Sequence, residues 1–264
     1  MSVRRLRIRR RRGEKLAMVT AYDWSFARLI AQTDVDAILV GDSAAMVMHG
    51  FADTPSVPLD AMIYHVASVA RGAPEKFIIA DIPFGWAHRS RDSFMDAVMK
   101  LVSAGAHAIK VEGTGIQNES IALALDAGIP VMGHIGLTPQ HVHRLGGHRV
   151  QGKSEGAIET LVHEAKQLED IGCFGCVLEC VIPAAAQAIQ AALESMITIG
   201  IGAGSETDGQ ILVMHDLLGL NQEHQPRFVR RFGEIGQATT DAVSSYIDAV
   251  RDVSYPSPEE TYAS

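Results

Sequence analysis

The segment Ala37-Ile38-Leu39-Val40-Gly41-Asp42 is the clearest strand signal in this chain, because an apolar run rich in β-branched residues leads directly to a carboxylate. Two more runs have the same form and lead to Asp81 and Glu112. Continuous apolar runs of this length are typical of parallel strands that are covered on both faces. Polar groups just beyond the carboxyl ends of such strands lie where α/β folds bind their ligands.

Two further polar residues, His134 and Glu179, also follow apolar runs. An Asp at such a position often caps the next helix, so Asp42 or Asp81 taken alone leaves that interpretation open. Five polar strand ends in succession are harder to explain as caps, since Glu and His are poor N-caps. Three carboxylates without accompanying Cys or paired His ligands favour a hard divalent cation, Mg²⁺ first.

Length and composition support an α/β protein with a single (β/α)8 barrel, for which about 250 residues is typical. The chain has 264 residues, of which 47% are hydrophobic and 20% are charged. No repeat or low-complexity linker divides it, so we predict one barrel domain over residues 1–264 with a short basic segment at its start. No apolar stretch reaches the roughly 20 residues needed to cross a bilayer, so no membrane association is expected.

The net charge is −8, which does not favour a nucleic-acid partner. The segment from Arg4 to Arg12 is the exception, and it fits a nucleic-acid arm, an Arg-rich transit peptide or a solvated or oligomer-contacting helix. It contains no apolar core of a secretory signal, and the first predicted strand, residues 16–21, begins almost at once. We therefore favour the helix.

The cysteines lie close together, and Cys173 and Cys176 have a Cys-x-x-Cys spacing. A redox pair opens a helix, whereas this motif runs into the apolar strand before Glu179. A structural zinc site would need a second ligand pair, and none is visible. We expect small buried thiols, and the odd count that Cys180 completes suits a reducing cytoplasm.

Strand and helix patterns alternate along the chain, as a parallel barrel requires. Helices are predicted over residues 59–71, 91–103, 118–126, 155–170, 183–192 and 239–250, and the last two strands over 196–201 and 209–215. Two irregular segments, residues 49–58 and 136–152, are predicted to be loops at the active site.

Short motifs occur in a fixed order from about Gly13 to Tyr255. They include Thr20-Ala21-Tyr22-Asp23, Gly41-Asp42-Ser43, Ala80-Asp81-Ile82-Pro83-Phe84, Lys110-Val111-Glu112-Gly113, Gly133-His134-Ile135-Gly136-Leu137-Thr138-Pro139-Gln140 and Leu178-Glu179-Cys180. One of these motifs alone would be weak, but the ordered set is very specific. Together they closely resemble the ketopantoate hydroxymethyltransferase family.

The resemblance implies a (β/α)8 barrel of the phosphoenolpyruvate/pyruvate type. It implies transfer of a hydroxymethyl group from 5,10-methylenetetrahydrofolate to 3-methyl-2-oxobutanoate, which gives 2-dehydropantoate in pantothenate biosynthesis. It also implies Mg²⁺ or a similar divalent ion and a homo-oligomer that is often a decamer. The partners would be the small-molecule 2-oxo acid and the folate.

Residue roles carry over position by position. The acids that match the metal ligands are Asp42, Asp81 and Glu112, the last directly or through water. The side chains that match the positions holding the 2-oxo acid are Ser43, Asp81, Lys110 and His134. The position of the general base is matched by Glu179.

The chemistry agrees with these roles. Removal of the C3 proton of the 2-oxo acid develops charge on the C2 oxygen, so an enolate mechanism needs a cation there, and Mg²⁺ acts as a Lewis acid. Lys110 lies two positions before Glu112 in a strand and projects to the same side. The alternatives are that Lys110 is a surface lysine, that Ser43 caps the next helix, and that His134 is a core histidine.

The chain departs from the family pattern in its loops. The first lid loop reads Phe51-Ala52-Asp53-Thr54-Pro55-Ser56, His143 stands where Asn is usual, and His148 stands where Tyr or Phe is usual. None of these changes removes a proposed ligand or base. They affect the loops that would shape the folate and 2-oxo acid pockets.

Two other functions are possible. A Mg²⁺-dependent 2-oxo acid C–C lyase or decarboxylase of the phosphoenolpyruvate mutase and isocitrate lyase group would use the same enolate chemistry. That group commonly carries a Lys-Lys-Cys-Gly-His loop, which this sequence lacks. A catalytically inactive barrel could serve in assembly or bind nucleic acid through its Arg-rich start. The presence of all three acids together with Lys110 and Glu179 argues against that function.

Overall fold

The structure is a computed structural model that describes residues 2–221 and 225–262. The chain divides into two compact units, Met1–Val213 and Met214–Ser264. The first unit contains the barrel and all the predicted site residues. The expectation of one domain over residues 1–264 stays a prediction.

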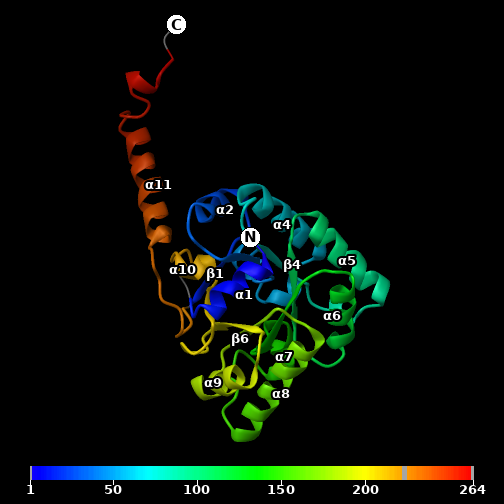
Figure 1. Cartoon of the computed structure of the whole chain (residues 1–264). Helices are drawn as coiled ribbons and strands as arrows, with labels where there is room; N and C mark the ends of the chain where they lie inside the picture. Colours follow the sequence, from blue (N-terminus) through cyan, green and yellow to red (C-terminus); the bar gives the residue numbers. More distant parts are fainter. Residues whose placement is uncertain (1, 222–224, 263–264) are drawn as a thin grey trace. The chain divides into compact units, whose positions relative to one another are not determined.

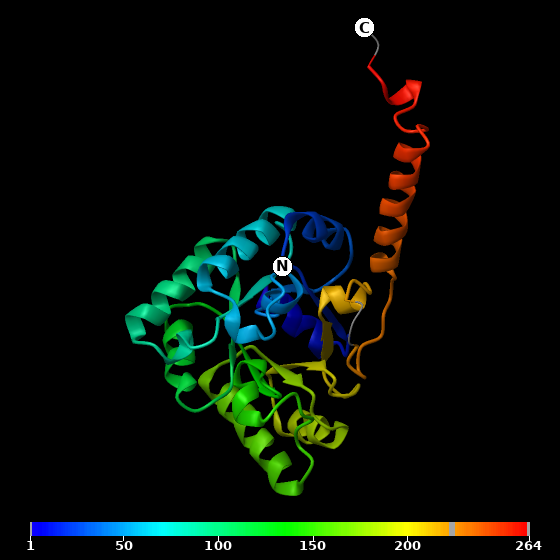
Figure 2. The ribbon, with the colours of Figure 1, turned by 180° about the vertical axis from the view of Figure 1, so that it is seen from behind.

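Eight parallel strands form a closed barrel in which each strand pairs with the next and β8 pairs with β1 (Figures 1 and 2). The strands are β1 (Leu16–Thr20), β2 (Ala37–Val40), β3 (Ile78–Asp81), β4 (Ala108–Glu112), β5 (Val131–Gly136), β6 (Gly175–Glu179), β7 (Ile197–Ile201) and β8 (Gly209–Leu212). Most of their residues are buried, which explains the apolar runs in the sequence. The predicted (β/α)8 architecture is confirmed.

Helices follow the strands and surround the barrel (Figure 1). They are α2 (Trp24–Ala31), α4 (Leu59–Gly72), α5 (Arg91–Ser103), α6 (Gln117–Asp126), α8 (Glu155–Ile171) and α9 (Pro183–Ala192). Helix α8 begins where the Ser154 side chain accepts a hydrogen bond from the Ala157 N–H, and it ends at Gly172 with φ of 111°. The predicted bounds of α5 and α9 are confirmed.

Several shorter elements were not predicted. The segment 136–152 contains η3 (Pro139–His141) and α7 (Val142–Leu145), and η1 (Thr54–Ser56) lies in the segment 49–58. Two more short helices are α3 (Ala44–Val47) and η2 (Trp86–His88). Helices this short have no visible hydrophobic period, so a prediction based on periodicity misses them.

Helix α1 (Val3–Arg11) lies at the amino-terminal end of the barrel and buries Leu6. Arg9 forms an ion pair with Asp36, the residue before β2, and Arg10 pairs with Asp208, the residue before β8, at 2.9 Å. The helix predicted for the Arg-rich start is therefore present.

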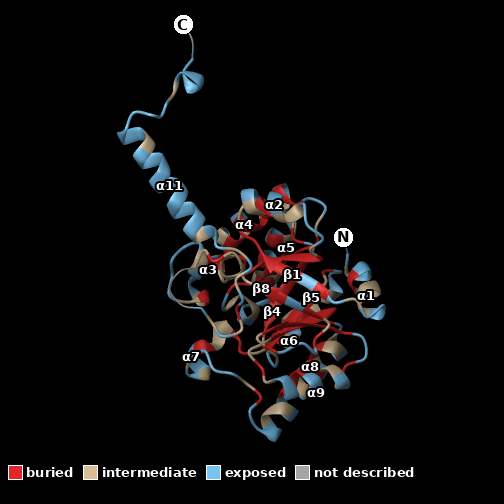
Figure 3. Ribbon diagram, turned by 90° about the vertical axis from the view of Figure 1, so that its left-hand side faces the viewer, coloured by how far each residue is buried: buried red, intermediate tan, exposed pale blue. Residues whose placement is uncertain are grey.

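Buried residues concentrate on the strands and on the inner sides of the surrounding helices (Figure 3). Cys173 and Cys176 are buried free thiols, as expected, and Cys180 is half-buried. Among residues 2–221 and 225–262, none of the helices combines the length and the apolar character that spanning a membrane requires.

The second unit contains α10 (Met214–Leu217), α11 (Ile235–Arg251) and η4 (Pro258–Glu260). Strand β8 was predicted to reach His215, but it ends at Leu212 and the chain then enters α10. Helix α11 is longer than the predicted 239–250 and has no buried residue. It exposes apolar side chains that include Val243, Tyr246 and Val250.

Candidate active site

The predicted site residues gather at the carboxyl ends of consecutive strands. They are Asp42 and Ser43 after β2, Asp81 at the end of β3, Lys110 and Glu112 on β4, His134 on β5 and Glu179 at the end of β6. The parallel register sets Asp81 beside Lys110 and Glu112 beside His134. Strand β5 was expected to run to His134, but it continues two residues further to Gly136.

Lys110 is at the centre of the cluster. Its Nζ lies 3.1 Å from Asp81 Oδ1, 3.5 Å from Glu112 Oε1 and 3.1 Å from His134 Nδ1. All four residues are at most 4% exposed, so these charges interact in a nearly dry environment. Lys110 is therefore not a surface lysine.

Glu179 is the most open of these carboxylates, with a side chain that is 17% exposed. Its Oε2 lies 3.3 Å from His134 Nε2, while His134 Nδ1 lies 3.2 Å from Glu112 Oε1. His134 thus links Glu179 to the buried acids, and it is not an isolated core histidine. Glu179 has no ion pair with Lys110 in the described part of the chain, so it is not neutralised by that lysine.

Gln140 is a site residue to which sequence reasoning gave no role. Its Nε2 donates to Asp42 Oδ2 at 2.8 Å and to the Ile82 carbonyl at 3.0 Å, and its backbone N–H donates to Glu112 Oε2 at 3.0 Å. One residue of the β5–α7 connection therefore positions two acids from different strands. The one sequence feature that could have pointed to Gln140 is its place at the end of the motif that contains His134.

Tyr22 is a second residue without a predicted role. It is completely buried, and its hydroxyl shares a hydrogen bond of 2.8 Å with Ser43 Oγ. Ser43 makes no side-chain capping bond to α3, so the capping interpretation is wrong. Burial raises the pKa of Tyr22 well above its usual range, which keeps the hydroxyl protonated. The sequence feature that could have pointed to Tyr22 is the motif Thr20–Asp23 at the end of β1.

The acids of the cluster differ in their proton affinity. Burial raises the pKa of Asp42, and repulsion from Asp81 and Glu112 raises it further. Burial also raises the pKa of Asp81 despite the attraction of Lys110. Glu112 behaves differently, because His134 and Lys110 outweigh the effect of burial and lower its pKa to about 2.

The two bases of the cluster hold their protons. Burial opposes the charge on Lys110, but Asp81, Glu112 and Asp42 outweigh it and raise the lysine pKa. Burial and Lys110 likewise oppose protonation of His134, yet Glu112 and Glu179 raise its pKa to about 9. The cluster therefore combines two cationic side chains, which could hold an anionic group, with a larger number of carboxylates.

The donor set fits a divalent cation. Asp81 Oδ1 is buried and accepts no hydrogen bond among the described residues, because the contact with Lys110 is not aligned for one. Repulsion between Asp42 and Asp81 would be relieved by a cation, and carboxylate oxygens suit Mg²⁺. In the described part of the chain, no three His, Cys, Asp or Glu side chains form a complete site, so water and substrate oxygens would be needed.

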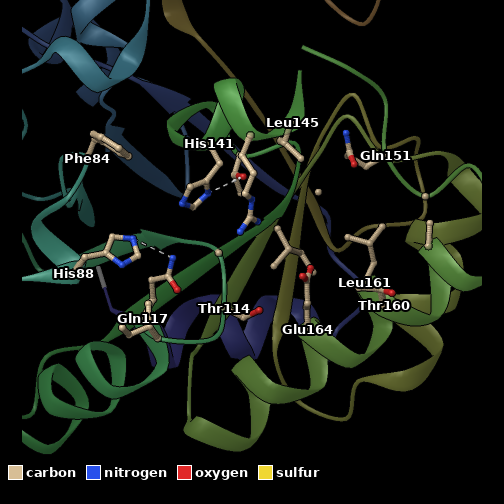
Figure 4. Close-up of a pocket in the computed structure, with 18 residues that line it drawn as sticks. Phe84, His88, Thr114, Gln117, His141, Leu145, Gln151, Thr160, Leu161 and Glu164 are labelled. Carbon is tan, nitrogen blue, oxygen red and sulfur yellow. Dashed lines mark hydrogen bonds between the residues drawn. The ribbon is translucent and has the colours of Figure 1, made fainter. Parts of the chain in front are cut away.

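A cavity of about 670 Å³ adjoins the cluster (Figure 4). It is lined by the β4–α6 connection, the β5–α7 connection and α8. His141, in its wall, hydrogen-bonds Thr138 at 3.0 Å, and a weaker contact of 3.4 Å joins Gln117 Nε2 to His88 Nε2. The cavity lies next to the acidic cluster, since Gly113 in its wall directly follows Glu112.

Fold and site define an α/β-barrel enzyme whose charged centre lies at the carboxyl ends of the strands. A family model described as ketopantoate hydroxymethyltransferase matches residues 1–258. The chain belongs to the ketopantoate hydroxymethyltransferase family, as its ordered motifs predicted.

Relatives named 3-methyl-2-oxobutanoate hydroxymethyltransferase support this assignment. The chain is 47% identical to one from Francisella tularensis subsp. tularensis (strain FSC 198) over 249 residues, which are 94% of each protein. It is 46% identical to another from Bdellovibrio bacteriovorus over 250 residues, which are 95% of each.

The barrel is also similar to a solved structure of 2,3-dimethylmalate lyase, a member of the PEP mutase/isocitrate lyase superfamily. The TM-score is 0.61 with 15% sequence identity, covering 98% of this chain and 91% of the other. At this identity the similarity concerns the barrel fold alone.

Proposed function

We propose that this enzyme transfers a hydroxymethyl group from 5,10-methylenetetrahydrofolate to 3-methyl-2-oxobutanoate and forms 2-dehydropantoate for pantothenate biosynthesis. The family match over residues 1–258 supports the reaction. The observation that carries the proposal is that Glu179 is the most open carboxylate of the cluster and makes no ion pair with Lys110 in the described part of the chain, since enolisation needs an accessible base beside a cationic centre.

Glu179 is the proposed general base that takes the C3 proton of the 2-oxo acid. Its carboxylate is partly exposed, so it can reach a substrate carbon at the open side of the cluster. His134 holds Glu179 in place through the 3.3 Å contact and offers a proton near the reacting carbon. Lys110 and Ser43 would bind the substrate carboxylate and keto oxygen, with Asp81 on the same side.

The proposed metal ligands are Asp42 and Asp81, with Glu112 acting directly or through water. When bound, Mg²⁺ would supply a Lewis acid for the C2 oxygen of the substrate. Gln140 orients Asp42 and Glu112 for this role through its side chain and backbone bonds. Such outer partners orient ligand carboxylates and tune metal affinity.

The overall reaction balances with one water. C3 of the substrate loses its proton and forms a bond to the one-carbon unit, the bonds from that carbon to the folate nitrogens break, and water supplies the hydroxyl oxygen. Tetrahydrofolate leaves as the second product. A 2-oxo acid C–C lyase or decarboxylase would need no folate, and the family match does not favour it.

The remaining expectations are part of the same proposal. The protein would act in the cytoplasm as one functional barrel domain, and it would form a homo-oligomer, with a decamer as one possible assembly. The exposed apolar residues of α11 support self-association, because amphipathic helices bury such faces against a partner. The negative net charge gives no support to a nucleic-acid partner.

Product analysis tests the proposal. The protein is incubated with 3-methyl-2-oxobutanoate, 5,10-methylenetetrahydrofolate and Mg²⁺, and products are identified by NMR. We expect 2-dehydropantoate and tetrahydrofolate in equal amounts. Recovery of both substrates unchanged would contradict the proposal, whereas folate-independent cleavage of a C–C bond would favour the lyase.

A further inference from the structure

The cavity beside the charged cluster is lined by residues other than those proposed to bind the 2-oxo acid. None of the residues assigned to the acid or the metal lines it. Its volume of about 670 Å³ is within the range of about 300–1,000 Å³ typical of small-molecule pockets. It is therefore large enough for a second ligand of drug-like size.

Two glycines bring this cavity next to the reacting groups. Gly113, in the cavity wall, directly follows Glu112, and a Cβ there would lie 3.3 Å from both Gln117 and His141. Gly136, also in the wall, is the register partner of Glu179. A ligand in the cavity would thus lie beside the proposed base.

Glu164 is the only carboxylate among the residues that line the cavity. Figure 4 shows its side chain extending from α8 into the cavity. It makes no hydrogen bond or ion pair within the described part of the chain, and it is half-buried. Burial raises its pKa, against the attraction of Arg144. A carboxylate in this setting gains most from a ligand that presents two adjacent N–H donors.

The outer rim of the cavity has the opposite charge. The segment 141–154 contains Arg144, Arg149 and Lys153 and no acid, and all three cationic side chains are exposed. Arg144 lines the cavity itself. His143 and His148, two of the departures from the family pattern, lie in the same segment.

We propose that this cavity binds the reduced folate of the proposed reaction, with Glu164 accepting from the 2-amino and N3–H groups of the pterin and with the basic rim facing the anionic glutamate tail. The inference rests on the proposed function. Apolar walls at Leu161 and Ile135 cover the flat faces of the ring. The one-carbon unit, between the pterin and the tail, then faces Gly136 and the base beside it.

The test compares Glu164→Gln with Glu159→Gln, an exposed glutamate of the same helix that lies outside the cavity. Thr160→Trp, in the cavity wall, provides a second way to impair the site without touching Glu164. Affinity for tetrahydrofolate is measured by calorimetry. Exchange of the C3 proton of 3-methyl-2-oxobutanoate with deuterated water is measured separately, with Mg²⁺ and without folate.

We expect Glu164→Gln to weaken tetrahydrofolate binding by about tenfold or more, as for the loss of a charge-assisted hydrogen bond. Thr160→Trp should also weaken it, while Glu159→Gln binds normally and all variants exchange the C3 proton at the wild-type rate. Wild-type affinity in both cavity variants would overturn the inference. Absence of C3 proton exchange in the wild-type protein would instead contradict the proposed function. Failure of the folate inference and failure of the proposed function therefore give different results.

Discussion

The two ends of this barrel both gather charged residues, but they do so in different ways. At the amino-terminal end, Arg9 and Arg10 pair with Asp36 and Asp208, and each arginine keeps contact with solvent. At the carboxyl end, Lys110 lies among buried carboxylates, and Asp81 Oδ1 accepts no hydrogen bond in the described part of the chain.

The difference indicates which charges serve stability and which serve chemistry. Partly exposed ion pairs contribute about 0–1 kcal/mol each and tie a helix to the barrel. Buried groups with shifted pKa values and unsatisfied atoms are costly, and such groups cluster at functional sites. Changes at the carboxyl end should therefore affect chemistry, and changes at the amino-terminal end should affect stability.

The largest effect is expected for Glu179→Gln. The amide cannot accept the C3 proton, so exchange in deuterated water should fall by about 10² to 10⁴-fold, as for a general base. Binding of 3-methyl-2-oxobutanoate, measured by calorimetry, should persist because Lys110 and Ser43 remain. Exchange at the wild-type rate would remove Glu179 from this role.

Asp81→Asn should act through the metal. A carboxylate becomes a neutral amide, so affinity for Mn²⁺, followed by electron paramagnetic resonance, should fall beyond the 10–100-fold typical of outer partners. Turnover at limiting Mg²⁺ should fall in parallel, and Asp42→Asn should behave similarly. Unchanged Mn²⁺ affinity in both variants would refute the metal role.

Gln140→Ala should weaken Mn²⁺ binding by about 10–100-fold, since Asp42 and its neighbours lose their orienting amide. The backbone bond to Glu112 would remain, so the fold should be preserved. Gln140→Glu, which adds a like charge beside Asp42, should be worse still. Equal Mn²⁺ affinity in wild type and both variants would show that Gln140 does not position the acids.

The positions of the acids could be predicted from the sequence, because each follows an apolar run and parallel strands end at one face. The contacts of Gln140 and Tyr22 could not, since they depend on how the loops fold back over the strand ends. The end of β8 was misjudged because Val213 and Met214 continue its apolar run into α10. Local pattern thus predicts strands well, but it does not predict tertiary contacts.

Deleting residues 1–12 should affect the other end of the barrel. Loss of buried Leu6 removes about 1.5–3 kcal/mol of stability, and loss of Arg9 destabilises further because it leaves the buried carboxylate of Asp36 without its cation. The truncated protein should unfold at a lower temperature than the full chain. Its rate of C3 proton exchange at room temperature should stay normal. Light scattering would report any change in assembly. Retained assembly with abolished exchange would place the arginines at the active site instead.

The smallest effect concerns His65 on α4, whose Nδ1 lies 2.6 Å from the Tyr22 carbonyl and whose Nε2 lies 2.8 Å from His49 Nε2. Burial is the largest cause and lowers the pKa of His65 below 6.5, against the hydrogen bond to the Tyr22 carbonyl, and His49 lowers it further. Because the folded-state pKa is depressed, its contribution is present above about pH 6.5 and is lost as the pH falls. His65→Gln should make the unfolding temperature less sensitive to acid. An identical pH profile would contradict this.

The central claim is that the buried charged cluster makes the C3 proton of a 2-oxo acid removable. The most direct measurement is deuterium incorporation at C3 of 3-methyl-2-oxobutanoate, followed by NMR without folate. We predict exchange that requires both the protein and Mg²⁺ and that disappears with Glu179→Gln. No exchange in the presence of Mg²⁺, or the same exchange in that variant, would contradict the account.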